Sequence, residues 1–314
     1  MGKQTLSTTV SADQAGRCDL VVREMTSLSR SRVRGLFDHG CVRVNGIPCI
    51  DLGHPVADGD VVRIDYDPGQ GYKPKKQEWD DRNFSILYED DDLLVVDKAA
   101  GALTVATDRG EPNTLETRVG VYLSHAGRKR NAFIVHRLDR EVSGLLVIAK
   151  SYRVAEALIE QFKQHKPERV YVAIVAGKFG NDSGTIRSHL ATGKNLDRFS
   201  APESDETELA VTHYKVLQHL RDTTLLEVRL ETGRRNQIRV HLAESRHPVL
   251  GDPRYGKKFA RHPHWSSKRL ALHAHTLGFE HPVTKERLTC ESKLPVEMER
   301  FIAHSTTEAS PTPP

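Results

Sequence analysis

Residues 136–150 read HRLDREVSGLLVIAK, and in this stretch ionisable side chains lead directly into an apolar run. Residues 142–149 form the longest uncharged apolar stretch of the chain, and their number suits a buried strand. His136, Arg137 and Asp139 therefore stand at the mouth of a rigid element, a place where a functional site can be built. Spacing alone leaves Asp139 open as a catalytic carboxylate or as a turn and capping residue. No further ligand stands at metal spacing, so we predict no metal site here.

A second stretch, RVYVAIVAG at residues 169–177, alternates like a strand. The alternation places Tyr171 on one face together with Ala173 and Val175. These small neighbours leave the ring face open to a nucleobase, and such stacking contributes about 1–3 kcal/mol per base. An ordinary core or edge tyrosine is the alternative interpretation.

A third stretch, ETGRRNQIRVHLAESRHPVLGDPRYG at residues 231–256, is rich in arginine. Gly233 ends a strand, and a short cationic helix is expected to begin near Asn236. Arg234, Arg235 and Arg239 lie near its start, where a helix N-terminus and guanidinium groups together bind anions. The phosphate-loop spacing G-x-x-x-x-G-K-[ST] is absent. If Arg239 meets Asp139, its guanidinium would hold that carboxylate ionised and oriented.

The length of 314 residues suggests about two domains. We expect a flexible arm at residues 1–16, a small α/β domain at 17–66, a Pro-, Gly- and Lys-rich linker at 67–80, a large domain at 81–302 and a disordered tail at 303–314. In the large domain the predicted strands outnumber the helices and do not alternate regularly with them. This pattern favours an α+β fold over a doubly wound one.

The small domain has a helix that Ser29 can cap, followed by an Asn45-Gly46 hairpin signal. Seven arginines and seven acidic residues balance over residues 17–66. Four of these arginines are expected around the helix start and the next strand, where they suit a phosphate backbone. They are Arg30, Arg32, Arg34 and Arg43. An ordinary solvated helix face explains the same charges equally well.

Composition excludes several classes of protein. The net charge of +4 is only mildly basic, so affinity for nucleic acid has to come from local clusters. The apolar runs are far shorter than the ~20 residues of a membrane span, and the start of the chain lacks the apolar core of a secretory signal. Four scattered cysteines without a C-x-x-C pair fit a reducing cytoplasm.

In these motifs the chain closely resembles the RluA-type family of RNA pseudouridine synthases. Residues 136–150 resemble its catalytic-loop motif, residues 169–177 its tyrosine strand and residues 233–256 its arginine motif. Two more stretches resemble the strands at the beginning and the end of its catalytic domain, namely LYEDDDLLVVDKAAG (87–101) and RLALHAHTLGFEHPVT (269–284). Residues 17–66 resemble the RNA-binding module of the small-subunit ribosomal protein S-four.

The resemblance implies a pseudouridine synthase fold, with a mixed, largely antiparallel central sheet flanked by helices. It implies that Asp139 is the nucleophile on a flipped uridine, at either the ribose or the base, and that Arg137 fills the gap left by the extruded base. Tyr171 would pack on the uracil, and Arg239 would pair with Asp139. An RNA partner is implied, whereas no cofactor, metal or membrane is needed, and we expect a monomer.

The sequence departs from the family pattern at three positions: Val142 stands where Thr is usual, Asn236 where His is usual, and Ala99 where Pro is usual. These departures bear on the substrate contacts.

Ribosomal RNA, of the large subunit in particular, is the favoured substrate, and transfer RNA is the alternative. A non-catalytic RNA-binding or ribosome-assembly factor that retains the fold is a rival from another class. A hydrolase acting on a glycosidic bond is disfavoured, because no second carboxylate is clearly paired with Asp139.

Overall fold

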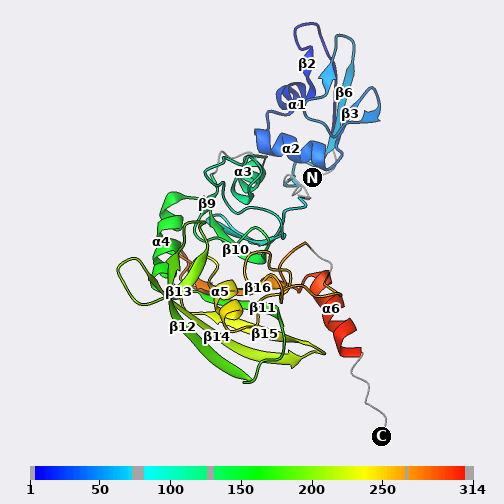
Figure 1. The fold of residues 1–314 in the computed structure, drawn as a ribbon. Coiled ribbons are helices and arrows are strands. Elements are labelled where there is room, and N and C mark those ends of the chain that lie inside the picture. Colours follow the sequence, from blue (N-terminus) through cyan, green and yellow to red (C-terminus); the bar gives the residue numbers. More distant parts are fainter. Residues whose placement is uncertain (1–3, 73–80, 126–130, 266–267, 308–314) are drawn as a thin grey trace. The chain divides into compact units, whose positions relative to one another are not determined.

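The computed structural model describes residues 4–72, 81–125, 131–265 and 268–307, and the chain divides into two units, Met1–Glu78 and Trp79–Pro314 (Figure 1). The first unit packs two helices on a small antiparallel sheet of strand order β1-β6-β3-β4, beside the pair β2-β5. Its elements are β1 (Gln4–Thr9), β2 (Gly16–Arg17), α1 (Cys18–Thr26), α2 (Arg30–Asp38), β3 (Val42–Val44), β4 (Ile47–Pro48), β5 (Pro55–Val56) and β6 (Val61–Tyr66).

Two local predictions for this unit are confirmed. The Ser29 hydroxyl accepts a hydrogen bond from the Arg32 N–H at 3.4 Å and so caps α2, whose apolar face is buried. Asn45 and Gly46 have φ values of 51° and 82°, and they join β3 to β4 in a tight hairpin. Both residue types tolerate this left-handed conformation, which explains why the pair is a strong hairpin signal.

The flexible arm predicted for residues 1–16 is wrong over Gln4–Thr9. This segment is strand β1, which pairs with β6 along its whole length. Its Thr-rich alternation suits a strand, Leu6 packs against the core of the unit, and the Thr5 hydroxyl donates to Asp65 at 2.6 Å. The polar composition concealed this, because an edge strand needs few apolar residues.

Two further boundaries differ from the prediction. The first residues of the predicted linker fold back onto the first unit, where Tyr72 packs on the core and its hydroxyl accepts from the Asp67 N–H at 2.9 Å. Residues 73–80 lie outside the described residues. Helix α6 (Val296–Thr307) continues into the segment predicted as a disordered tail, so that prediction is wrong over 303–307, and residues 308–314 lie outside the described residues.

The second unit is built on one large sheet of strand order β13-β12-β14-β15-β11-β16-β10-β8-β7, with β17 paired to β16 and β9 to β10. Every pair is antiparallel except β10 with β16. The α+β class and the mixed, largely antiparallel sheet are therefore confirmed. Its other elements are β7 (Phe84–Glu89), β8 (Leu93–Lys98), α3 (Leu115–His125), β9 (Phe133–Ile134), β10 (Ser143–Ala149), α4 (Tyr152–Lys163), β11 (Glu168–Ala176), β12 (Ser183–Thr192), β13 (Arg198–Ala201), β14 (Glu208–His219), β15 (Thr223–Leu230), α5 (Gln237–Glu244), β16 (Leu272–Glu280) and β17 (Arg287–Glu291).

Strand β10 is buried on both faces over all seven residues. Leu146 and Ile148 lie in the larger core, to which α3, α5 and α6 contribute. Leu145 and Val147 point into a second core, which α4 covers. Since a strand packed on both faces has little freedom, the turn that precedes β10 has a rigid base. None of the helices among the described residues is long and apolar enough to cross a bilayer.

Candidate active site

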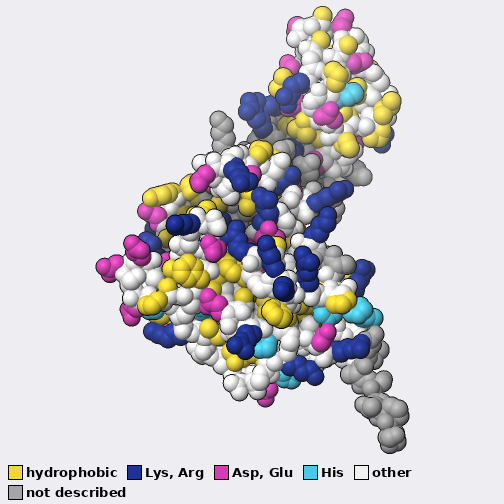
Figure 2. Space-filling view, viewed as in Figure 1, with side chains coloured by type: hydrophobic (Ala, Val, Ile, Leu, Met, Phe, Trp, Pro, Cys, Tyr) yellow, Lys and Arg dark blue, Asp and Glu magenta, His cyan; other side chains and the backbone are white. Residues whose placement is uncertain are grey.

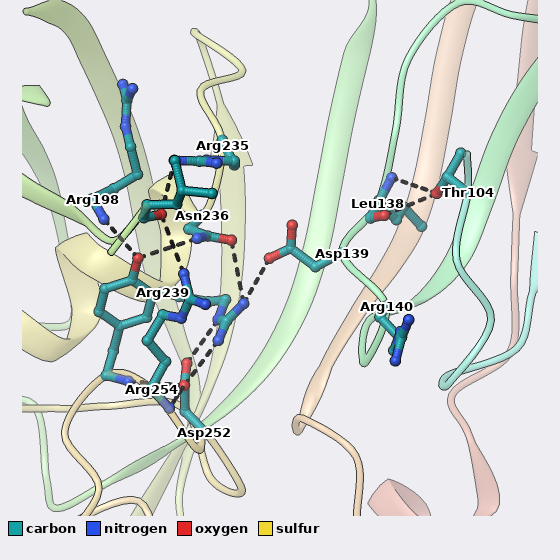
Figure 3. Close-up of polar contacts among 12 residues, drawn as sticks. Thr104, Leu138, Asp139, Arg140, Arg198, Arg235, Asn236, Arg239, Asp252 and Arg254 are labelled. Atoms are coloured by element: carbon teal, nitrogen blue, oxygen red, sulfur yellow. Dashed lines mark hydrogen bonds and ion pairs between the residues drawn. The ribbon is translucent and has the colours of Figure 1, made fainter. Parts of the chain in front are cut away.

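Asp139 lies in the turn that leads into β10, and its side chain is 21% exposed. The turn is closed by the Val142 N–H, which donates to the Asp139 carbonyl at 3.2 Å. Before Asp139, Leu138 is tied to the Thr104 side chain (Figure 3). The carboxylate therefore projects from a turn that is fixed on both sides.

Arg239, on the first turn of α5, meets this carboxylate. One terminal nitrogen of its guanidinium (Nη1) donates to Asp139 Oδ2 at 2.9 Å. The other two nitrogens donate to the two oxygens of Asp252, at 2.8 and 3.0 Å, so Arg239 lies between two carboxylates (Figure 3). Burial disfavours the charge of Arg239, but its hydrogen bonds and ion pairs with Asp252 and Asp139 outweigh burial and raise its pKa. The pairing of Asp139 with Arg239 that the sequence suggested is present.

Two more side chains hold Arg239, and the sequence motifs do not mark either for this role. The guanidinium lies over the Tyr255 ring, 5.1 Å from its centre, which adds a cation–π contact. Asn236 accepts from Arg239 Nη1 at 3.2 Å and donates to the Tyr255 hydroxyl at 3.1 Å. Asp252 and Tyr255 stand in the segment GDPRYG (251–256), yet no periodicity or charge pattern distinguishes them as partners of Arg239.

Beside the ion pair lies a cavity of about 140 Å³. Its apolar wall is formed by Leu138, Val142, Tyr171, Leu230, Ile238 and Leu272. All six site residues predicted for the large domain line this cavity, namely Arg137, Asp139, Tyr171, Arg234, Arg235 and Arg239. Asp139 and Arg239, which stand 100 positions apart in the sequence, thus converge on one small cavity.

The mouth of the site is basic. A second cavity of about 250 Å³ shares Asp139 with the first and is lined by Arg137, Arg140, Arg235 and Arg254. Figure 2 shows Lys and Arg side chains gathered on the face of the second unit over α5. Such a surface favours a polyanion at the entrance, while the apolar wall behind it favours an uncharged ring.

Tyr171 lies on β11, at an irregularity in the pairing of β11 with β16. The residue is only 9% exposed and its side chain forms part of the cavity wall. Burial raises the pKa of its hydroxyl, the nearby charge of Arg169 opposes this, and Asp139 adds to it. The ring is thus a neutral, largely buried wall next to the carboxylate. Stacking of a nucleobase on this ring stays a prediction.

The remaining predicted arginines differ in how they are engaged. Arg234 pairs with Glu208 at 3.0 Å and donates to the Leu209 carbonyl. Arg235 is exposed and donates to the Leu196 carbonyl at 2.8 Å, and Arg137 lies at the mouth. Binding of RNA by these three residues stays a prediction.

The four arginines predicted for the small domain all lie in the first unit. Arg30 and Arg32 are exposed on the first turn of α2, and Arg34 on the next turn is half-buried. Arg43 is exposed on β3 and donates to the Gly46 carbonyl at 3.2 Å. Their role in RNA binding likewise stays a prediction.

The three departures from the family pattern have local consequences. Val142 is a buried part of the cavity wall, and Asn236 takes part in holding Arg239. The Ala99 N–H donates to the Asn83 carbonyl at 2.7 Å, a bond that a proline could not make. None of the three departures falls on Asp139, Tyr171 or Arg239.

Among the described residues, the side chains grouped closely enough to share a metal ion are Asp90, Asp92 and His281. Asp90 accepts from His281 at 2.9 Å and from the Asp92 and Leu93 N–H groups, so hydrogen bonding explains this group. None of these residues lines the cavity beside Asp139.

The second unit thus combines a mixed sheet with an arginine-bound aspartate, a cavity lined by Tyr171 and a basic mouth, an arrangement that suits chemistry on a base of a nucleic acid. Residues 92–244 match the family described as RNA pseudouridylate synthase. The chain is 35% identical over 288 residues to the ribosomal large subunit pseudouridine synthase D of Zymomonas mobilis, covering 88% of this chain and 89% of that protein. It is 34% identical to the protein of the same name from Vibrio cholerae, with 93% and 92% covered.

A solved structure, human RNA pseudouridylate synthase domain containing 4, is 26% identical and covers 70% of this chain and 90% of its own, with a TM-score of 0.56. The chain belongs to the RNA pseudouridine synthase family, of the RluA type, and is an isomerase. The fold and the class of enzyme expected from the sequence are confirmed.

Proposed function

We propose that this enzyme converts uridine to pseudouridine in ribosomal RNA, of the large subunit in particular, and that Asp139 is its nucleophile. The observation that carries the chemistry is the Asp139–Arg239 pair, at 2.9 Å, on the edge of a cavity lined by Tyr171. Two curated relatives that match along most of this chain are named for the ribosomal large subunit, which supports the choice of RNA.

The geometry suits a role for the Asp139 carboxylate as a nucleophile that bonds to the uridine and is later released. Arg239 binds Oδ2 of Asp139, and among the described residues no hydrogen bond is made to Oδ1. Oδ1 is therefore available to form a bond to the substrate, at the ribose carbon C1′ or on the base. Two hydrogen bonds to Asp252 fix the guanidinium of Arg239 in place. Arg239 can therefore hold the carboxylate of Asp139 in one orientation during the reaction.

The reaction is an isomerisation whose atoms balance within the uridine. The bond from ribose C1′ to uracil N1 breaks, the uracil turns, and a bond from C1′ to C5 forms. C5 loses its proton and N1 gains one, so the overall composition is unchanged. Asp139 is released at the end, as covalent catalysis requires. In this scheme Tyr171 packs on the uracil and assists the loss of the C5 proton.

A uridine stacked in a helix cannot reach this cavity, so the nucleotide has to be extruded, at a cost of a few kcal/mol. Arg137 lines both the cavity and its mouth, and it fills the gap left in the RNA. The apolar wall accepts the uracil ring, while the arginines at the mouth bind neighbouring phosphates. The first unit, with the arginines of α2, provides a separate RNA contact.

Purified protein incubated with total RNA from a strain lacking the gene tests this function, with pseudouridines mapped before and after. We expect new pseudouridines in large-subunit ribosomal RNA. Modification confined to transfer RNA would instead support the transfer-RNA alternative. Binding to RNA without conversion of any uridine would overturn the proposal and favour a ribosome-assembly factor.

A further inference from the structure

The turn that carries Asp139 is attached to the segment that follows β8. Residues 98–104 run alongside this turn and contribute two buried polar side chains, Lys98 and Thr104. Both side chains bond to the backbone of the residues next to Asp139 rather than to Asp139 itself. Neither lines the cavity beside Asp139 or its mouth, so neither is placed to touch the substrate there.

Thr104 holds the residue before Asp139. Its hydroxyl donates to the Leu138 carbonyl at 2.9 Å and accepts from the Leu138 N–H at 3.2 Å (Figure 3). The side chain of Thr104 is buried, with 1% of the residue exposed. One hydroxyl therefore satisfies both backbone groups of Leu138, and its loss would leave two buried polar groups without this partner.

Lys98 holds the residue after Asp139. Its ammonium donates to the Arg140 carbonyl at 3.2 Å and to the carbonyls of Ala99 and Ala102, each at 2.9 Å. The Gly101 N–H donates to the same Arg140 carbonyl at 2.7 Å. Burial lowers the pKa of Lys98 to about 7, against the opposing charges of Asp139 and Glu141.

We infer that Thr104 is a positioning residue for the reaction, which fixes the main chain at Asp139 while Arg239 fixes the carboxylate. This inference rests on the proposed role of Asp139 as nucleophile. Arg239 reaches Asp139 from α5, and Thr104 reaches the same turn from the segment after β8. A reacting atom held from two elements needs little rearrangement, and a displacement of about 1 Å can lower a rate as much as a hundredfold.

The test compares Thr104→Val, which keeps the shape and removes the hydroxyl, with Thr104→Ser, which keeps the hydroxyl. The rate constant for pseudouridine formation is measured with enzyme in excess over RNA, and the affinity for RNA is measured separately. We expect Thr104→Val to lower the rate constant about tenfold with affinity unchanged, and Thr104→Ser to restore most of the rate. Thr104→Ala replaces the valine variant in the comparison if the valine variant does not fold.

The control is Thr114→Val. Thr114 is equally buried, and its hydroxyl accepts from the Thr117 N–H at the start of α3, not from the catalytic turn. This change should lower the melting temperature and leave the rate constant of the folded enzyme unchanged. Equal rate constants for wild type, Thr104→Val and Thr104→Ser would overturn the inference, as would equal rate losses in Thr104→Val and Thr114→Val.

Asp139→Asn separates this inference from the proposed function. If that variant still forms pseudouridine at the wild-type rate, the proposed nucleophile is wrong. If it is inactive while Thr104→Val reacts like wild type, only the role of Thr104 is wrong.

Discussion

At the scale of single residues, the site depends on Arg239, which is buried and forms ion pairs with both Asp139 and Asp252. Its side chain is 7% exposed and that of its partner Asp252 is 0% exposed. By contrast, the Arg229–Glu227 pair lies at the surface, with the arginine 54% exposed. Exposed pairs contribute about 0–1 kcal/mol to stability, whereas breaking a buried pair costs about 3–5 kcal/mol, because one charge is left without compensation.

Arg239→Lys should therefore be far from conservative. The planar guanidinium of Arg239 donates to Asp252 and Asp139 from three nitrogens at once. A lysine has a single ammonium group and cannot reproduce this arrangement of hydrogen bonds. We expect the rate constant for pseudouridine formation to fall at least about a hundredfold, in line with the loss of an oriented charge at a reacting group. Arg229→Lys is the matched control and should react normally. A loss of less than about threefold in Arg239→Lys would show that the fork is not needed.

The sequence indicated Asp139, Tyr171 and Arg239, because each stands in a distinctive motif next to a strand or helix of clear periodicity. It did not indicate that Asp252 and Tyr255 hold Arg239. These two residues lie in a loop, and their importance comes from where the fold places them. Thr104 was missed for the same reason, since its partner is the backbone of a residue 34 positions away.

At the scale of elements, the parallel pairing of β10 with β16 requires close approach at Gly144. This residue has a φ of +115°, and a Cβ atom added to it would lie 2.2 Å from the Ala274 carbonyl oxygen. Backbone on a neighbouring strand cannot move aside as a flexible side chain can. Gly144 therefore sets how closely β10, and with it the turn that carries Asp139, approaches β16.

Gly144→Ala should prevent the second unit from folding normally, since strain at positive φ adds to the clash with backbone. Gly120→Ala is the contrasting change, because Gly120 lies in α3 with nothing within 4 Å of an added Cβ. That variant should be more stable by roughly 0.5–1 kcal/mol. Thermal unfolding of both variants measures the difference. A fully folded Gly144→Ala of normal stability would contradict this account of the pairing.

Strands β10 and β11 were predictable because each reads as a short apolar run, and burial on both faces reinforces it. The edge strand β1 was not, because its polar alternation resembles that of a free arm until β6 is present to pair with it. The pairing order of the large sheet was also beyond the sequence. Neighbours such as β10 and β16 are joined only by long-range contacts, about which local patterns carry no information.

At the scale of the whole molecule, RNA binding is expected to depend on the first unit as well as on the cavity mouth. The triple variant Arg30→Gln, Arg32→Gln and Arg34→Gln should weaken binding to structured RNA and flatten its salt dependence, by about 0.7–0.9 in slope for each phosphate that is no longer neutralised. Turnover of a short oligonucleotide should be retained. Filter binding at several salt concentrations checks this.

The control for that variant is the pair Arg17→Gln and Arg63→Gln, two exposed arginines of the same unit that are engaged with Asp19 and Asp65. If the control and the triple variant lose the same affinity, the arginines of α2 have no special role, and their charge belongs to an ordinary solvated helix face.

The second unit should be sensitive to acid, because three of its histidines are held neutral. Burial lowers the pKa of His136 to about 3 and those of His241 and His273 to about 4. Their folded pKa values lie below the unfolded value of 6.5, so protons bind preferentially to the unfolded chain as the pH falls from 6.5 towards 4. Stability is therefore full above pH 6.5 and declines below it, by about 1.4 kcal/mol per pH unit for each histidine.

Urea unfolding between about pH 7.5 and 4.5 measures this decline, with tryptophan fluorescence as the signal, since Trp265 is buried in the core of the second unit. In His241→Gln the decline should be shallower, because a glutamine amide can keep the hydrogen bond to Ser188 without titrating. Equal stability at about pH 7.5 and about pH 5 would contradict the expectation.

The central claim is that the carboxylate of Asp139 forms and breaks a bond with the target uridine. The most direct measurement is the single-turnover rate of pseudouridine formation by Asp139→Asn, with its affinity for the same RNA measured in parallel. Asparagine keeps the shape and a hydrogen-bond acceptor for Arg239 but removes the nucleophilic charge. We expect affinity close to that of wild type and no detectable pseudouridine. Pseudouridine formed by Asp139→Asn at a rate comparable with wild type would contradict it.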